Sequence, residues 1–123
     1  MGSPATGAAR QFAQSNLGGP TNELESTPTV TTTVSQVVNA NGDRVGLLIM
    51  NIGTDIAYIG LSAQVSSSFG IELAAGGGVA TFTVRDDFTL PARQWMGVAQ
   101  NTSTVLYVLE EVRITLNPPA VTP

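Results

Sequence analysis

The chain contains no histidine, no cysteine and no lysine in its 123 residues. It therefore lacks the imidazole that acts as a base near neutral pH, the thiolate nucleophile, and the amine that forms Schiff bases. The common nitrogen and sulfur ligands of zinc and other transition metals are missing too. These absences predict a protein that is not an enzyme and has no cofactor. Only a hard ion with oxygen ligands, such as calcium, stays open to it.

Positive charge is also scarce. Five arginines stand against nine acidic residues, which gives a net charge of -4, and the arginines are spread singly along the chain. A nucleic-acid-binding surface needs clustered basic residues, so we expect no nucleic-acid partner. The start of the chain has no continuous apolar segment like that of a secretory signal, and the longest apolar stretch, Val45–Met50, is too short to span a bilayer. We therefore expect no membrane partner.

What the chain does have is a regular series of β-signals. Segments rich in Val, Ile, Thr and aromatic residues are separated by Gly, Asn, Asp and Ser turns, and none shows the periodicity of a helix. The predicted strands are 29–38, 44–52, 56–61, 69–73, 79–84, 94–100 and 104–114. Short strands at this spacing, in a chain of one-domain length, predict an all-β fold. We expect a single jelly-roll-like or Greek-key β-sandwich of about seven to eight strands.

Asn41-Gly42, between two of these strands, is the strongest hairpin signal in the chain. Both residues tolerate the positive φ of a type I′ turn, so the pair predicts that residues 29–38 and 44–52 are neighbours in one sheet. The alternation of apolar residues predicts a core built from most of the strands. Its expected members are Val45, Leu47, Ile49, Ile56, Tyr58, Ile71, Leu73, Phe82, Val84, Trp95, Val98, Leu106 and Val108.

Two pairs of adjacent acids, Asp86-Asp87 and Glu110-Glu111, are the densest groups of titratable side chains. Neighbouring residues on an extended chain point to opposite faces, so neither pair can flank one bond as a general acid and base. We interpret Asp86 and Asp87 as part of a solvated turn. For the second pair, we expect one glutamate to face inward or to lie at a sheet edge.

The two ends of the chain differ in composition from its middle. Residues 1–28 hold three prolines and much Gly, Ala, Ser and Thr, too little apolar surface to fold alone, so we expect an extended N-terminal arm that is flexible in isolation. Residues 117–123, which also hold three prolines, are expected to form an extended tail. The predicted division is therefore an arm over 1–28, a sandwich domain over 29–116 and a tail over 117–123.

The arm contains a few side chains able to bind a partner. These candidates are Arg10, Phe12, Leu17 and Leu24. They are either incidental residues of a disordered tail or anchors that insert into grooves of another protein. Arms that fold on binding cover large surfaces with few anchors, and we favour that interpretation.

The middle of the chain resembles small β-sandwich modules of the virion proteins of tailed bacteriophages. Such modules tend to have an Arg-led apolar strand ending in Asn-x-Gly, then a Tyr-x-Gly strand, a Gly-Ile-x-Leu strand before a glycine turn, an aromatic-led strand, and a last strand ending in Val-x-Val-Leu-Glu. The matching residues here are Arg44, Asn51, Gly53, Tyr58, Gly60, Gly70, Ile71, Leu73, Gly76, Trp95 and Glu110.

The resemblance implies a capsid decoration, or cement, protein. Proteins of this kind sit on the outer capsid surface over joints between major capsid subunits, often as dimers or trimers, and stabilise the shell. The major capsid protein would then be the partner, in a virion assembled in the host cytoplasm. The alternative is a head-fibre or tail-associated module that binds a carbohydrate or receptor, for which Tyr58, Trp95 and Tyr107 are the candidate aromatic side chains.

Overall fold

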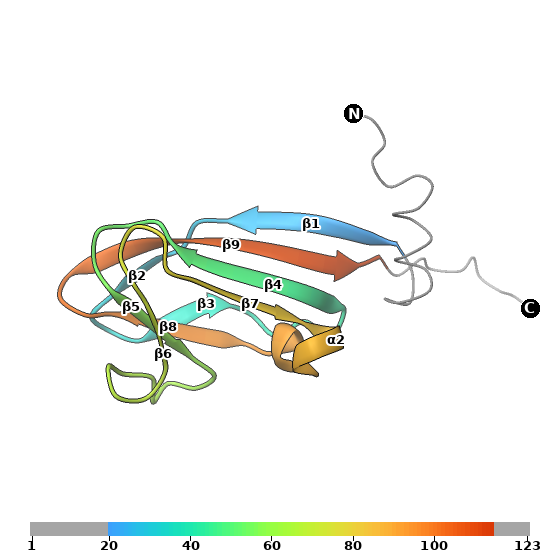
Figure 1. Cartoon of the computed structure of the whole chain (residues 1–123). Coiled ribbons are helices and arrows are strands. Elements are labelled where there is room, and N and C mark those ends of the chain that lie inside the picture. Colours follow the sequence, from blue (N-terminus) through green and yellow to red (C-terminus); the bar gives the residue numbers. More distant parts are fainter. Residues whose placement is uncertain (1–19, 115–123) are drawn as a thin grey trace, which may run out of the picture.

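The computed structural model describes residues 20–114, which form two antiparallel β-sheets packed face to face (Figure 1). The larger sheet contains β1 (Thr21–Ser26), β2 (Thr29–Thr31), β9 (Ser103–Arg113), β4 (Arg44–Asn51) and β7 (Val79–Thr83). The smaller sheet contains β3 (Ser35–Val38), β8 (Trp95–Ala99), β5 (Ala57–Gly60) and β6 (Ile71–Leu73). A short helix, α2 (Val84–Asp87), and a 3-10 turn, η1 (Leu90–Ala92), lie between β7 and β8.

The strand order is that of a jelly roll. From β2 to β9 the chain changes sheet at every connection except β5 to β6, and the two four-strand orders are β2-β9-β4-β7 and β3-β8-β5-β6. Two sheets wound in this way form the double Greek key of jelly-roll proteins. The predicted all-β sandwich is confirmed, with nine strands in residues 20–114 rather than seven or eight.

Two strands are additional to the seven ranges predicted. The predicted strand 29–38 is divided into β2 and β3, which lie in different sheets, and β1 comes from the predicted arm. β1 and β2 run along β9 in one unbroken register, with Ser26 opposite Val108 and Thr29 opposite Val105. Pro28, which has no N–H to donate, separates the two strands, yet its carbonyl still accepts a hydrogen bond of 2.9 Å from the Leu106 N–H. Residues 21–26, which we expected to belong to a flexible arm, are therefore part of the larger sheet.

The hairpin predicted at Asn41-Gly42 was wrong. A turn is present, because the Arg44 N–H donates to the Asn41 carbonyl at 3.0 Å, but it carries the chain from β3 in the smaller sheet to β4 in the larger one. Gly42 does not have the positive φ that a type I′ turn requires. The Asn-Gly pair therefore marks the reversal without determining which strands pair.

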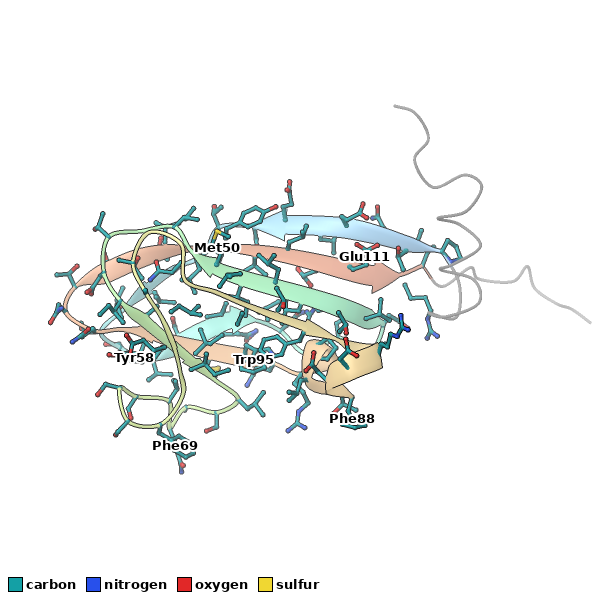
Figure 2. The ribbon with its side chains drawn as sticks, viewed as in Figure 1. Met50, Tyr58, Phe69, Phe88, Trp95 and Glu111 are labelled. Carbon is teal, nitrogen blue, oxygen red and sulfur yellow. The ribbon has the colours of Figure 1, made fainter. Side chains whose placement is uncertain are left out.

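Eight of the expected core residues are buried between the sheets or beneath a loop. They are Leu47, Ile49, Tyr58, Leu73, Phe82, Trp95, Leu106 and Val108. The rings of Phe82 and Trp95 stack with their centroids 4.6 Å apart, and Trp95 Nε1 donates to the Leu90 carbonyl at 3.1 Å. Figure 2 shows Trp95 between the two layers.

The other five expected core residues lie nearer the surface. Ile71 and Val84 are each 40% exposed, and Val45, Ile56 and Val98 are partly buried. Ile71 is on the edge strand β6, and Val84 begins α2 instead of ending a strand. Seven apolar side chains outside the predicted set are also buried: Val30, Val37, Val38, Ala57, Ile59, Val65 and Ala99.

Candidate interaction surfaces

Three of the four predicted partner-binding residues, Arg10, Phe12 and Leu17, lie outside the described residues. The fourth, Leu24, is on β1 opposite Glu110 and is 45% exposed. Leu24 is therefore held in the edge strand of a sheet and does not lie in an unpaired arm. Whether it contacts a partner stays a prediction.

The two ends of the described chain meet at one corner of the larger sheet. The Ile114 N–H, just beyond β9, donates to the Pro20 carbonyl, just before β1, at 2.8 Å. Residues 1–19 and 115–123 are therefore both joined to the sandwich at this corner. Within residues 20–114, β1 pairs only with β9, so its other side is a sheet edge.

The outward face of the larger sheet carries a group of neighbouring apolar side chains. Leu47 and Ile49 point into the core, so Leu48 and Met50 between them point outward, and the register places outward residues of β9 and β7 beside them. We name this surface the outer face: Leu48, Met50, Val79, Tyr107 and Leu109. Four of these side chains are partly exposed and Val79 is 47% exposed.

Acidic side chains border the outer face along β1. Glu23 lies directly opposite Glu111 of β9, and like charges in that position disfavour pairing. Partial burial raises the pKa of the Glu111 carboxyl, and Glu23 raises it further, against the effect of the hydrogen bond from Thr21. The Tyr107 hydroxyl donates to Glu25 at 2.5 Å, and this bond raises the pKa of Tyr107.

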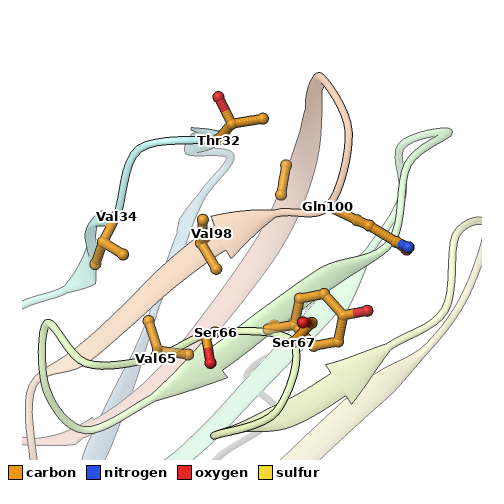
Figure 3. A pocket seen from close by; sticks show the side chains of 9 residues that line it. Thr32, Val34, Val65, Ser66, Ser67, Val98 and Gln100 are labelled. Carbon is orange, nitrogen blue, oxygen red and sulfur yellow. The ribbon is translucent and has the colours of Figure 1, made fainter.

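A shallow groove of about 320 Å³ lies on the outward side of the smaller sheet (Figure 3). The β5–β6 loop forms one wall, and Tyr58 is buried on the sheet's outward side beneath it. No residue with a formal charge lines the groove. Its lining is Thr32, Val34, Tyr58, Val65, Ser66, Ser67, Val98, Ala99 and Gln100.

One buried arginine connects strands and loops at the end of the sandwich opposite the groove. Arg44 is 1% exposed and its guanidinium donates from all three nitrogens. Nε donates to Glu110 Oε1 at 2.9 Å, and the other two nitrogens donate to the carbonyls of Asn39, Pro91 and Arg93 and to Asn39 Oδ1. Five donors with five acceptors leave none for a ligand, so this cluster is structural. It also shows that Glu110 is the inward-facing member of the Glu110-Glu111 pair, as expected.

A second buried polar cluster holds the connection between β4 and β5. The Asn51 side chain donates to the carbonyls of Asp55 and Leu73 at 2.7 and 2.9 Å, and accepts from the Gly53 N–H and the Thr104 hydroxyl. A Cβ at Gly53 would collide with Thr104 Oγ1 and come within 2.7 Å of the Val105 nitrogen. The Asn-x-Gly pattern is therefore explained by the requirements of the fold.

The Asp55 carboxylate joins two loops at the same end. It accepts hydrogen bonds from the backbone N–H groups of Asn101 and Thr102 at 2.7 and 2.8 Å. The Thr102 bond, followed by the Asn101 bond, lowers the pKa of Asp55. Sequence reasoning placed Asp55 only in a turn, because the contact spans 46 residues of sequence.

Neither the protein-family models nor the curated proteins compared with the chain match it. In the part of the chain that the structure describes, no group of three or more acidic side chains is arranged to hold a metal ion. No helix among the same residues is long and apolar enough to cross a membrane. The surfaces above are therefore the features from which a function can be argued.

Proposed function

We propose that this chain is a structural, non-enzymatic virion protein that binds the outer surface of a capsid shell as a decoration protein. The observation that carries the proposal is the corner at Pro20 and Ile114. There, residues 1–19 continue directly from the exposed edge strand β1 of a jelly roll. A segment that leaves a folded module beside an open sheet edge is well placed to reach across neighbouring subunits.

The mechanism that we propose is strand addition supported by repetition. An extended segment pairs with exposed sheet edges through main-chain hydrogen bonds, and an edge such as that of β1, which pairs on one side only within residues 20–114, accepts a strand in the same way. The apolar outer face next to β1 adds surface that excludes water on contact. A shell presents many copies of the same site, so modest contacts in a dimer or trimer of this chain are multiplied by avidity.

The decisive experiment compares the full chain with a variant that lacks residues 1–19. Deleting 1–28 is unsuitable, because it would also remove β1 from the sheet. The purified full chain should bind saturably to capsids assembled without it and raise their disruption temperature. The shortened variant should keep its fold, measured by far-UV circular dichroism, and lose most of this binding. Deletion of residues 115–123, which join the same corner, is the matched control. Undiminished binding by the 20–123 variant would contradict the mechanism.

A carbohydrate-binding module is the second candidate, because the groove on the smaller sheet has hydroxyl and amide groups and no formal charge. Neutral sugars are recognised by such groups beside an aromatic ring. The platform is small, however: Trp95 is buried in the core, and Tyr58 is only 6% exposed. Binding of neutral oligosaccharides that is lost in Gln100→Ala, with unchanged capsid binding, would favour this candidate over the first.

A further inference from the structure

Phe88 combines the greatest exposure of any large apolar side chain in residues 20–114 with a disfavoured backbone. Its side chain is 81% exposed, and its φ and ψ are 59° and -118°. It is the one non-glycine residue with positive φ in the part of the chain that the structure describes. Thr89, which follows, has φ -93° and ψ 0°. These are the dihedral angles of the two central residues of a type II′ turn, whose first position is normally glycine.

No contact within residues 20–114 offsets the disfavoured backbone conformation of Phe88. A bulky L-residue with positive φ is strained, and such strain persists where the surrounding structure imposes it. A buried ring would offset the strain through apolar contact, but this ring is mostly in water. Figure 2 shows Phe88 at the edge of the molecule beyond α2, away from the sandwich. For the stability of the folded chain alone, glycine would serve better at position 88.

The turn around Phe88 is itself well fixed. Thr83 caps α2 by accepting a bond from the Asp86 N–H at 3.3 Å, and the Thr83 N–H donates to Asp87 Oδ2 at 2.9 Å. On the other side, η1 is held by Pro91, which is buried, and by the Arg93 N–H bond to the Leu90 carbonyl. A rigid turn that projects one aromatic ring loses little conformational entropy when that ring is buried by a partner.

We infer that Phe88 is the anchor by which this chain docks into a hydrophobic pocket of its partner. The inference rests on the proposed decoration function and gives it a specific residue in the sandwich. Aromatic side chains that fill a partner's pocket supply a large share of the affinity of many interfaces. The helix α2 before Phe88 carries Asp86 and Asp87 against the single Arg85, a net negative charge, so the fitting pocket is apolar at its base with Arg or Lys side chains at its rim.

The test uses Phe88→Gly, a change that separates folding from binding. Glycine removes both the ring and the strain, so the midpoint of thermal unfolding should rise on the order of 5 °C. Binding to capsids assembled without the protein should weaken on the order of thirtyfold. A loss of binding by a more stable variant cannot be attributed to unfolding. Phe88→Ala should weaken binding equally without the gain in stability, because alanine keeps the strained φ.

Phe69→Ala is the matched control, since Phe69 is also an exposed phenylalanine, at 60%, on a different loop. It should bind like the unmodified chain. Asp86→Asn should weaken binding a few-fold, because the rim of the pocket is inferred to be basic. Unchanged binding would overturn the inference of a basic rim. If the unmodified chain binds and Phe88→Gly binds as tightly, the anchor is overturned while the decoration function stands. If the unmodified chain does not bind capsids, both are overturned. A fall in the unfolding temperature of Phe88→Gly would overturn the strain argument.

Discussion

Replacing Arg44 with methionine should destabilise the sandwich more than any single exposed substitution. The variant Arg44→Met keeps most of the apolar stem and removes the guanidinium. The Glu110 carboxylate, 13% exposed, then loses its ion-pair partner, and the carbonyls of Asn39, Pro91 and Arg93 lose their side-chain donor. These groups connect β4 and β9 to the β3–β4 connection and to η1, so both sheets are affected.

The magnitude follows from the burial of the pair. Breaking a buried ion pair by removing one partner costs about 3 to 5 kcal/mol, because the other charge is left without compensation. That is a large part of the roughly 5 to 15 kcal/mol by which a domain is stable. At about 4 to 8 °C per kcal/mol for a domain of this size, the unfolding midpoint should fall on the order of 20 °C. The double variant Arg44→Met/Glu110→Leu should recover much of the loss, since it removes both charges.

The single tryptophan gives the assay. Trp95 is buried and stacked on Phe82, so its fluorescence reports on the packing between the sheets during unfolding in urea. Arg113→Met is the matched control: its ion pair with Asp43 is 2.8 Å long, close to the 2.9 Å of the Arg44–Glu110 pair, but its side chains are about 40% exposed, and it should cost less than about 1 kcal/mol. An Arg44→Met cost no larger than that of Arg113→Met would refute the reasoning.

Three further substitutions test other parts of the fold. Glu111→Gln should stabilise the chain at neutral pH by about 0.5 kcal/mol, because it ends the repulsion by Glu23. Because the pKa of Glu111 is raised in the folded chain, its contribution to stability is present at low pH and is lost as pH rises through the folded pKa. Urea unfolding at a series of pH values should therefore show a shallower decline of stability in the variant. Asp55→Asn should destabilise the chain near neutral pH. Because the pKa of Asp55 is lowered in the folded chain, its contribution to stability is present above the unfolded pKa of 3.8 and is lost as pH falls through the folded pKa. Acid unfolding of the variant, followed by circular dichroism, should therefore lose part of its pH dependence. In thermal unfolding followed by circular dichroism, Gly53→Ala should cost roughly 2 to 3 kcal/mol by its collision with β9. Gly42→Ala, with nothing within 4 Å of its Cβ, should be close to neutral in the same measurement.

The fold class was predictable because β-signals are local. Alternation along 44–52 correctly assigned Leu47 and Ile49 to the core, and the spacing of turns correctly predicted a sandwich. Pairing was not predictable, because a turn such as Asn41-Gly42 reverses the chain equally well within one sheet or between two. The alternation rule also missed Ile59 beside Tyr58, because a loop buries the outward side of β5 as well as its core side.

The candidate surfaces were less accessible to sequence reasoning. Glu110 and Arg44 were both noted as parts of a family pattern, but their contact joins residues 66 positions apart and depends on a register shift between Arg44 and Gly46 in the β4–β9 ladder. Sequence reasoning gave Phe88 no role. Its backbone angles, which only the folded chain defines, make it distinctive. The predicted anchors Arg10, Phe12 and Leu17 lie outside the described residues and stay predictions.

The register of β1 along β9 determines how the sandwich responds to force applied at Pro20. A pull along the strand axis loads the ladder of residues 21–26 in shear, so its hydrogen bonds resist together. A pull across the strand opens the pairs one at a time, beginning with Thr21 and soon reaching the repelling pair of Glu23 and Glu111. The attachment is therefore strong in one direction and weak in another. Under the proposed decoration function, a shell that expands beneath the module would be restrained along β1, while a tether that lifts away from the surface would peel the strand.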